Sequence, residues 1–390
     1  MGGLIVQEWI EPSGGAEQVL DAFRIAFPDS RLFTLWNDDP DRFPPGLVTE
    51  SWLARTPLRR HKALAMPLMP ATWRRSKVAQ KPDWVLASSY VFAHHGDFGT
   101  RRAGVPKFSY VHTPVRYLWE PALDGRGAGR LTALPREILK RIDRRAAADA
   151  GALAANSRFV RRRIARVWGR DARVIYPPVG AQQIIDGGDW SSHLDAADAE
   201  ILASLPESGF LLAASRLVPY KRHRDVIRMG EHLGIPVVVA GSGPERAALS
   251  ALAESSRVPV HILGFVSDEL MRALFQRALA FVFPPVEDFG IVPVEAMAAG
   301  CPVIVNREGG AAESVIDGVT GFQVDPDDLQ EVAGAVERLG SLRPDAAKAR
   351  AMEFDTTRFI REMREWLGDV APPPSGGWST GGDSSMVAAA

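Results

Sequence analysis

The chain has 390 residues, of which 46% are hydrophobic and 24% charged, a composition typical of a soluble protein of about two domains. Its single cysteine, Cys301, excludes an internal disulfide, and no apolar run approaches the roughly 20 residues that span a membrane. Residues 1–6 have neither a basic start nor a cleavage site, so we expect a cytoplasmic protein.

The net charge of −1 conceals an asymmetry between the two halves of the chain. Residues 1–180 hold 29 Lys and Arg against 17 Asp and Glu, a balance of +12, and the remainder has a balance of −13. A basic half indicates an anionic partner. Nucleic acid is not expected, because no aromatic-basic ribbon, zinc-ligand spacing or helix-turn-helix pattern accompanies the charge.

The densest basic segment is residues 55–77, where cations surround an apolar stretch and Trp73. This pattern is suited to peripheral contact with an anionic membrane. A solvated basic face over a loop that packs on the core explains it equally well. The basic residues are Arg55, Arg59, Arg60, Lys62, Arg74, Arg75 and Lys77.

In chain order, the first half predicts strands with long connections, and the second half alternates strands and helices regularly. First-half strands are expected at residues 4–6, 31–35, 84–87, 107–111 and 151–155. A Gly/Asp/Ser-rich stretch through Ser192 predicts a hinge. Second-half strands are expected at residues 210–214, 236–240, 260–265, 281–283, 303–305 and 321–324, and helices at 225–233, 245–256, 267–278, 292–299 and 311–316. This alternation is typical of a parallel doubly wound sheet.

Glu287 and Glu295 are the most informative residues of the second half. Residues 280–283 form an apolar run that two prolines end, and residues 292–299 have helical spacing, so the glutamates flank a strand-to-helix turn. Ligands bind at this edge of an open α/β sheet, and the free N–H groups of a helix start attract anions. Two carboxylates beside an anion site fit a ligand with both phosphates and hydroxyls, such as a sugar nucleotide.

Three weaker clusters follow other strands of the same predicted sheet. Arg216 and Lys221 are suited to clamp a diphosphate, although alone they are better explained as a solvated loop. Gly241 and Gly243 either let a ligand approach the backbone or form a plain turn, and an arginine in place of the third glycine excludes a dinucleotide fingerprint. Residues 308–310 add a polar edge or a simple helix cap.

No metal site is expected. His94 and His95 are adjacent, and adjacent side chains of a strand point to opposite faces, so a shared ion is not predicted. The chain also lacks an Asp-x-Asp pair for a metal-bound diphosphate. The two cations and the helix start are expected to neutralise the diphosphate instead, without a cofactor.

In this order, the motifs resemble the retaining glycosyltransferases of family 4, which have the GT-B fold. The resemblance rests on Arg216 with Lys221, the glycine turn and, above all, Glu287 with Glu295. Residues 287–295 and the His112-Thr-Pro segment are most similar to the mannosyltransferase branch that builds bacterial surface polysaccharides. The resemblance extends to about Leu367, and its other first-half matches are residues 14–17, 110–119, 156–159 and 174–179.

The resemblance implies two Rossmann-like doubly wound domains that face a cleft. Residues 1–178 are expected to form the acceptor-binding domain, which a crossover helix at about 355–370 rejoins, and residues 179–354 the nucleotide-sugar-binding domain. Residues 371–390 lack a core pattern and are expected to be a disordered tail.

The resemblance also implies roles for the candidate residues. Glu287 is expected to bind hydroxyls of the donor sugar, Glu295 those of the ribose, and His112 to line the sugar pocket, although without the resemblance a turn-capping histidine is preferred. The expected catalytic residues are Glu287, His112, Arg216 and Lys221. The expected nucleotide-binding residues are Gly15, Arg216, Lys221, Gly241, Gly243, Phe289, Gly290, Ile291 and Glu295, in part through backbone N–H groups.

We therefore expect a metal-independent, retaining hexosyltransferase. The best candidate donor is GDP-mannose. The favoured acceptor is a lipid-linked or otherwise anionic glycan at the inner membrane face, and a soluble natural product with a hydroxyl group is the alternative. No protein nucleophile is evident, which agrees with attack by the acceptor on the same face of the sugar from which the leaving group departs. Two alternatives stay open, a GT-B sugar-nucleotide epimerase and a non-catalytic sugar-nucleotide-binding protein.

Overall fold

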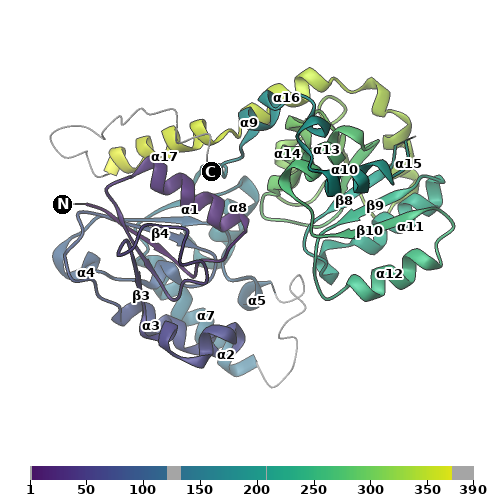
Figure 1. The fold of residues 1–390 in the computed structure, drawn as a ribbon. Helices are drawn as coiled ribbons and strands as arrows, with labels where there is room; N and C mark the ends of the chain where they lie inside the picture. Colours follow the sequence, from purple (N-terminus) through teal and green to yellow (C-terminus); the bar gives the residue numbers. More distant parts are fainter. Residues whose placement is uncertain (1, 121–132, 208, 371–390) are drawn as a thin grey trace. The chain divides into compact units, whose positions relative to one another are not determined.

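The computed structural model describes residues 2–120, 133–207 and 209–370 (Figure 1). The chain divides into two compact units, the first formed by the residues up to Pro178 with the segment from Thr357, and the second by Val179–Thr356. Each unit is a parallel sheet with helices on both faces, which confirms the predicted doubly wound α/β class. The tail predicted at residues 371–390 lies outside the described residues. Within those ranges, no helix has the length and hydropathy to cross a bilayer.

The sheet of the first unit runs in the order β3-β2-β1-β4-β5-β6-β7. The five predicted strands are present, but the two edge strands, β3 and β7, were not predicted. β3 has three residues and β7 has two, and strands this short show no periodic pattern in the sequence. The strands are β1 (Leu4–Gln7), β2 (Arg31–Thr34), β3 (Val48–Glu50), β4 (Val85–Ser89), β5 (Lys107–Val111), β6 (Ala152–Ala155) and β7 (Arg173–Val174).

The last helix, α17 (Thr356–Val370), completes the core of the first unit. Phe359 of α17 stacks on Phe23 of α1 with ring centroids 5.6 Å apart, and Trp366 and Leu367 are buried in the same cluster. Figure 1 shows α17, in yellow, beside α1, in purple. The other helices of this unit are α1 (Gly15–Ala26), α2 (Lys62–Ala65), α3 (Met69–Arg75), α4 (Thr100–Ala103), α5 (Arg116–Trp119), α7 (Ala133–Ala148) and α8 (Arg158–Trp168), with 3-10 turns η1 (Trp52–Arg55), η2 (Pro57–Arg60), η3 (Met66–Leu68) and η4 (Ala93–His95).

The sheet of the second unit has the order β10-β9-β8-β11-β12-β13 and contains each predicted strand. Its strands are β8 (Leu211–Ala214), β9 (Val237–Ala240), β10 (Val260–Gly264), β11 (Ala280–Phe283), β12 (Val303–Asn306) and β13 (Phe322–Val324). Its helices are α9 (Ala181–Asp186), α10 (Ala196–Ala203), α11 (His223–Leu233), α12 (Arg246–Glu254), α13 (Asp268–Arg277), α14 (Ile291–Ala298), α15 (Leu329–Glu337) and α16 (Pro344–Met352), with 3-10 turns η6 (Trp190–His193), η7 (Pro219–Lys221), η8 (Ala311–Ser314) and η9 (Leu339–Ser341).

One prediction for the second unit was wrong. The helix expected at residues 311–316 is only the 3-10 turn η8, because Val315 already has extended backbone. The boundary between the two units, at Pro178 and Val179, lies at the start of the segment expected as a hinge, and the Gly/Asp/Ser-rich stretch that follows is folded as α9 and η6. Trp190 is 5% exposed and donates from Nε1 to the Ile184 carbonyl at 2.9 Å, so one aromatic anchor outweighs the turn-rich composition around it.

The chain order reverses once in each sheet, between β1 and β4 and between β8 and β11. At such a reversal the loops after two neighbouring strands leave toward opposite faces, and the carboxyl edge between them is open to a ligand. The candidate residues of the second unit follow β8, β9 and β11, so the fold brings them to this edge.

Candidate active site

The loops after β8 and β11 meet through an ion pair. Lys221 Nζ lies 2.8 Å from Glu287 Oε1, and each side chain is only 14% exposed. The ring of Phe283, at the end of β11, lies 5.5 Å from the ammonium. The pair therefore places a cation and a carboxylate together at the β8/β11 reversal, in a poorly hydrated environment where charge interactions are strong.

Arg216 supplies a second cation on the β8 loop. Its guanidinium is exposed and donates from Nη2 to the Tyr220 hydroxyl at 3.0 Å. The neighbouring Arg222 has a different role, because it pairs with Asp225 at 2.6 Å and with Asp327. Sequence reasoning did not predict the contribution of Tyr220, which holds Arg216 against its own loop.

The start of α14 provides backbone donors beside this pair. Gly290 caps the helix with φ of 85°, a conformation that favours glycine. The first N–H groups of a helix have no intrahelical acceptor, and they attract anions. Phe289, by contrast, buries its ring against Phe354 with centroids 5.4 Å apart, so its side chain anchors the turn.

The loop after β12 fixes the position of Glu287. Gly310 N–H donates to the Glu287 carbonyl at 2.6 Å, and a Cβ at Gly310 would lie 1.9 Å from the Asp288 carbonyl oxygen. The buried Asn306 donates from Nδ2 to the Pro284 carbonyl at 2.9 Å. Residues 308–310, predicted as a polar edge or helix cap, thus include a backbone support for the site. Asn306 was not predicted.

Gly241 and Gly243 are required by chain packing. A Cβ at Gly241 would lie 1.9 Å from the Ser215 carbonyl oxygen, and one at Gly243 would lie 2.4 Å from that of Leu217. The turn after β9 therefore packs backbone to backbone against the loop that carries Arg216 and Lys221. This packing alone explains both glycines, whether or not a ligand also approaches them.

Glu295 lies one turn into α14 and is half-buried. Burial, reinforced by the charge of Asp268 and opposed by Arg272, raises its pKa to about 7. Among the described residues, its carboxyl group has no hydrogen bond or ion pair. It is therefore available to a ligand hydroxyl, as donor or acceptor according to its protonation.

His112 and Gly15 lie in the first unit, at the carboxyl ends of β5 and β1. His112 Nε2 is 2.8 Å from Ser88 Oγ, and Tyr110 and Tyr90 contact the imidazole edge-on. Burial lowers the pKa of His112 to about 3, so the ring is neutral at pH 7. The side chain binds a neighbouring strand end rather than capping its own turn. Gly15 is the first residue of α1.

Two protein-family models match this chain. One, described as Glycosyl transferases group 1, matches residues 196–352, and the other, described as Glycosyltransferase Family 4, matches residues 13–183. The chain belongs to glycosyltransferase family 4. Together the two models span both units of this glycosyltransferase, and the family predicted from the motifs is confirmed.

Curated relatives of this glycosyltransferase include mannosyltransferases. One is the GDP-mannose-dependent alpha-(1-6)-phosphatidylinositol monomannoside mannosyltransferase of Mycolicibacterium smegmatis, to which this chain is 33% identical over 240 residues. The aligned region covers 57% of this chain and 61% of the relative. This chain is 29% identical over 311 residues to the D-inositol 3-phosphate glycosyltransferase of Acidothermus cellulolyticus, covering 72% of this chain and 66% of the relative. The chain thus spans less than two thirds of the length of the first of these relatives.

Solved glycosyltransferases share the fold. HepE of Anabaena in complex with UDP-glucose superposes with a TM-score of 0.69 at 19% identity, over 95% of this chain and 100% of HepE. Sucrose-phosphate synthase of Thermosynechococcus elongatus gives 0.71 at 17% identity, over 95% and 99%. These similarities confirm the predicted GT-B fold for this family 4 glycosyltransferase.

Proposed function

We propose that this glycosyltransferase is a retaining, metal-independent hexosyltransferase that transfers mannose from GDP-mannose to a hydroxyl of a glycan or lipid-linked acceptor. The observation that carries the proposal is the Lys221–Glu287 pair at the β8/β11 reversal, beside the start of α14. A donor diphosphate replaces Glu287 as the partner of Lys221, and Glu287 then accepts hydrogen bonds from the sugar. Glu295 accepts those of the ribose.

The charges of the site support the chemistry of such a transfer. The bond between the anomeric carbon and the diphosphate breaks, the acceptor oxygen bonds to that carbon on the same face, and its proton passes to the departing phosphate. Negative charge therefore develops on the diphosphate, where Arg216, Lys221 and the first N–H groups of α14 stabilise it. His112, neutral at pH 7, is a hydrogen-bond partner for a sugar hydroxyl. Gly15 supplies a backbone N–H to the diphosphate.

The donor proposal rests on the relatives, not on the fold. The mycobacterial relative uses GDP-mannose by its name, whereas HepE was solved with UDP-glucose on the same architecture. The Lys221–Glu287 pair serves either donor, because its proposed contacts are to diphosphate and sugar and not to the base.

The test is a transfer assay with the full chain. A panel of nucleotide sugars is first screened by thermal shift, since a tight donor raises the melting temperature by mass action, and GDP-mannose is expected to give the largest shift. Radiolabelled GDP-mannose is then incubated with membrane lipid extract, and labelled mannolipid with retained anomeric configuration is the expected product. An epimerised nucleotide sugar formed without acceptor would identify an epimerase. A melting shift with no turnover on any acceptor would identify a binding protein.

We further propose that residues 52–77 bring the protein to an anionic membrane that holds its acceptor. Trp52, Leu64 and Leu68 are 54%, 66% and 41% exposed, while Met69 and Trp73 of the same segment are buried in the core. The segment thus has a core face and an exposed apolar face, with basic residues around it. Of those, Arg59 and Lys62 pair with Asp38 and Glu11, and the exposed cations are Arg55, Arg60, Arg74, Arg75 and Lys77.

Neutralising the exposed cations should weaken membrane binding. The variant Arg60→Gln/Arg74→Gln/Arg75→Gln is expected to lose affinity for vesicles with anionic lipid by about a hundredfold, since each of the three charges contributes about 1 kcal/mol. Vesicle co-sedimentation measures the loss. The matched control, Arg224→Gln/Arg228→Gln/Arg257→Gln, removes three cations of the second unit and should bind normally. Equal binding by both variants would exclude this surface.

A further inference from the structure

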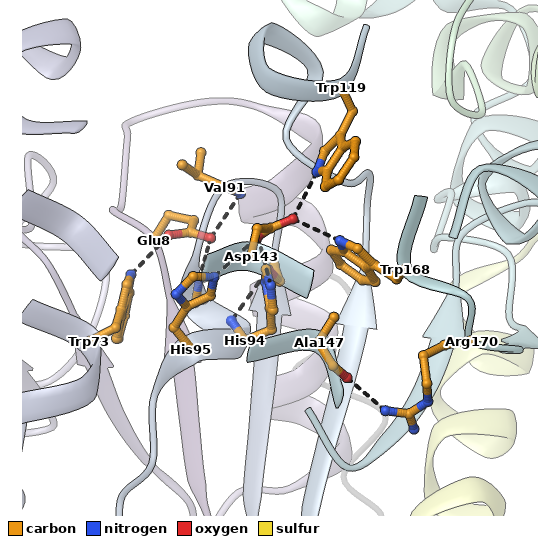
Figure 2. Close-up of polar contacts among 12 residues, drawn as sticks. Glu8, Trp73, Val91, His94, His95, Trp119, Asp143, Ala147, Trp168 and Arg170 are labelled. Carbon is orange, nitrogen blue, oxygen red and sulfur yellow. Dashed lines mark hydrogen bonds and ion pairs between the residues drawn. The ribbon is translucent and has the colours of Figure 1, made fainter. Parts of the chain in front are cut away.

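Outside the candidate active site, the first unit contains a buried cluster of two histidines and an aspartate. His94 and His95 come from the 3-10 turn η4, and Asp143 comes from α7. The Nε2 atoms of both histidines lie 3.1 Å from Asp143 Oδ1, and all three side chains are wholly buried. Figure 2 shows the two imidazoles turned toward the carboxylate.

His94 and His95 lie on a 3-10 turn and not in the strand assumed from the sequence. Adjacent residues point to opposite faces in a strand, but a 3-10 helix has about three residues per turn, so successive side chains diverge by only about 120°. The rings of His94 and His95 have centroids 4.5 Å apart. Neighbouring histidines on this turn reach the same carboxylate oxygen.

We propose that His94, His95 and Asp143 bind one divalent transition-metal ion, with Zn²⁺ as the best match. Imidazole nitrogen with a carboxylate oxygen is a common donor set for this ion. One donor atom from each residue lies within 4.8 Å of the others. With two of the separations at 3.1 Å and the third no more than 4.8 Å, an ion in the plane of the three atoms and equidistant from them lies about 2.5 Å or less from each, near the Zn²⁺ bond lengths of about 2.0–2.2 Å.

The surrounding hydrogen bonds orient the three donors toward one point. Asp143 Oδ2 accepts from the indole N–H groups of Trp119 at 2.8 Å and Trp168 at 2.7 Å, which leaves Oδ1 to face the histidines. Ser89 Oγ lies 2.8 Å from His94 Nδ1, so Nε2 is the free nitrogen of that ring. Such partners hold the ligands of a metal in the required orientation.

Hydrogen bonds alone do not satisfy the cluster. His94 Nε2 approaches Asp143 at 3.1 Å without the alignment of a hydrogen bond, and in the described chain neither it nor His95 Nδ1 has a hydrogen-bond partner. An ion would satisfy His94 Nε2 and tie η4 to α7. It would act as a structural ion, separate from the proposed diphosphate site.

Metal binding is tested on the tag-free full chain after chelator treatment and desalting. Titration with Co²⁺ should give a visible d–d absorption band that saturates at one ion per chain, and Zn²⁺ should displace it and raise the melting temperature. His95→Gln and Asp143→Asn should each lose the band and the thermal shift. The control His61→Gln, which removes an exposed histidine of the same unit, should retain both.

The wild-type titration decides the question even if a variant fails to fold. No stoichiometric band in the wild-type chain, with no thermal shift from Zn²⁺, would show a hydrogen-bonded cluster without an ion. Stoichiometric binding that survives in folded His95→Gln would place the ion elsewhere. Neither outcome depends on glycosyl transfer, so the proposal stands or falls independently of the proposed function.

Discussion

Glu287→Gln should lower kcat by about 10²–10³-fold, the usual cost of losing one polar contact that acts in the transition state. The amide keeps the size of the side chain but loses the charge, and with it the strong acceptor proposed for the sugar hydroxyls. Binding of GDP should not weaken, because Lys221 Nζ, 2.8 Å from Glu287 Oε1 in the wild type, no longer has a carboxylate competing with the diphosphate. Steady-state kinetics and calorimetry with GDP measure the two effects.

A matched control separates this role from general damage. Glu254→Gln neutralises an exposed glutamate at the end of α12 in the same unit, and it should leave kcat, GDP binding and the melting temperature unchanged. Full activity of Glu287→Gln would refute the proposed sugar contact. A loss of GDP binding in that variant would instead assign Glu287 to the nucleotide.

The repeating strand-helix pattern made the fold of the second unit predictable. Its strands are short apolar runs with glycine or proline at their ends, and the structure has a strand at each predicted run. The first unit was harder because β3 and β7 carry too few residues for a pattern. The stretch around Trp190 was hard to predict for another reason. Its composition indicates a linker, but the buried Trp190 ring packs it into the second unit.

The candidate site was predictable by type of residue but not by contact. Strand-end positions placed Lys221 and Glu287 at one sheet edge, yet nothing in their spacing of 66 positions showed that they would pair at 2.8 Å. Gly310 supports Glu287 because the two backbone segments pack closely together. The sequence shows a glycine at this position but not the segment that packs against it. The arrangement of His94 and His95 was missed for a related reason, because the prediction assumed a strand where the chain forms a 3-10 turn.

Lys221→Met should weaken GDP binding by about tenfold or more, since hydrogen bonds to a charged group contribute about 1.5–3 kcal/mol. It should also lower kcat, because the leaving diphosphate loses a cation when its charge develops. Methionine keeps most of the aliphatic length of the side chain, including its packing near Phe283. Lys348→Met on α16 is the matched control, and it should leave kcat and GDP binding unchanged.

The same variant tests whether Lys221 and Glu287 act as a pair. Lys221→Met removes the cation that lies beside a carboxylate only 14% exposed, so the free energy of unfolding should fall by about 1–3 kcal/mol. Adding Glu287→Gln removes the negative charge that Lys221 faced and should recover part of the loss, a coupling that a double-mutant cycle by chemical denaturation measures. GDP binding should stay weak in the double variant, because the cation is still missing. Additive effects on stability would mean that the two side chains do not interact in solution. Tight GDP binding by the single or the double variant would show that Lys221 does not contact the diphosphate.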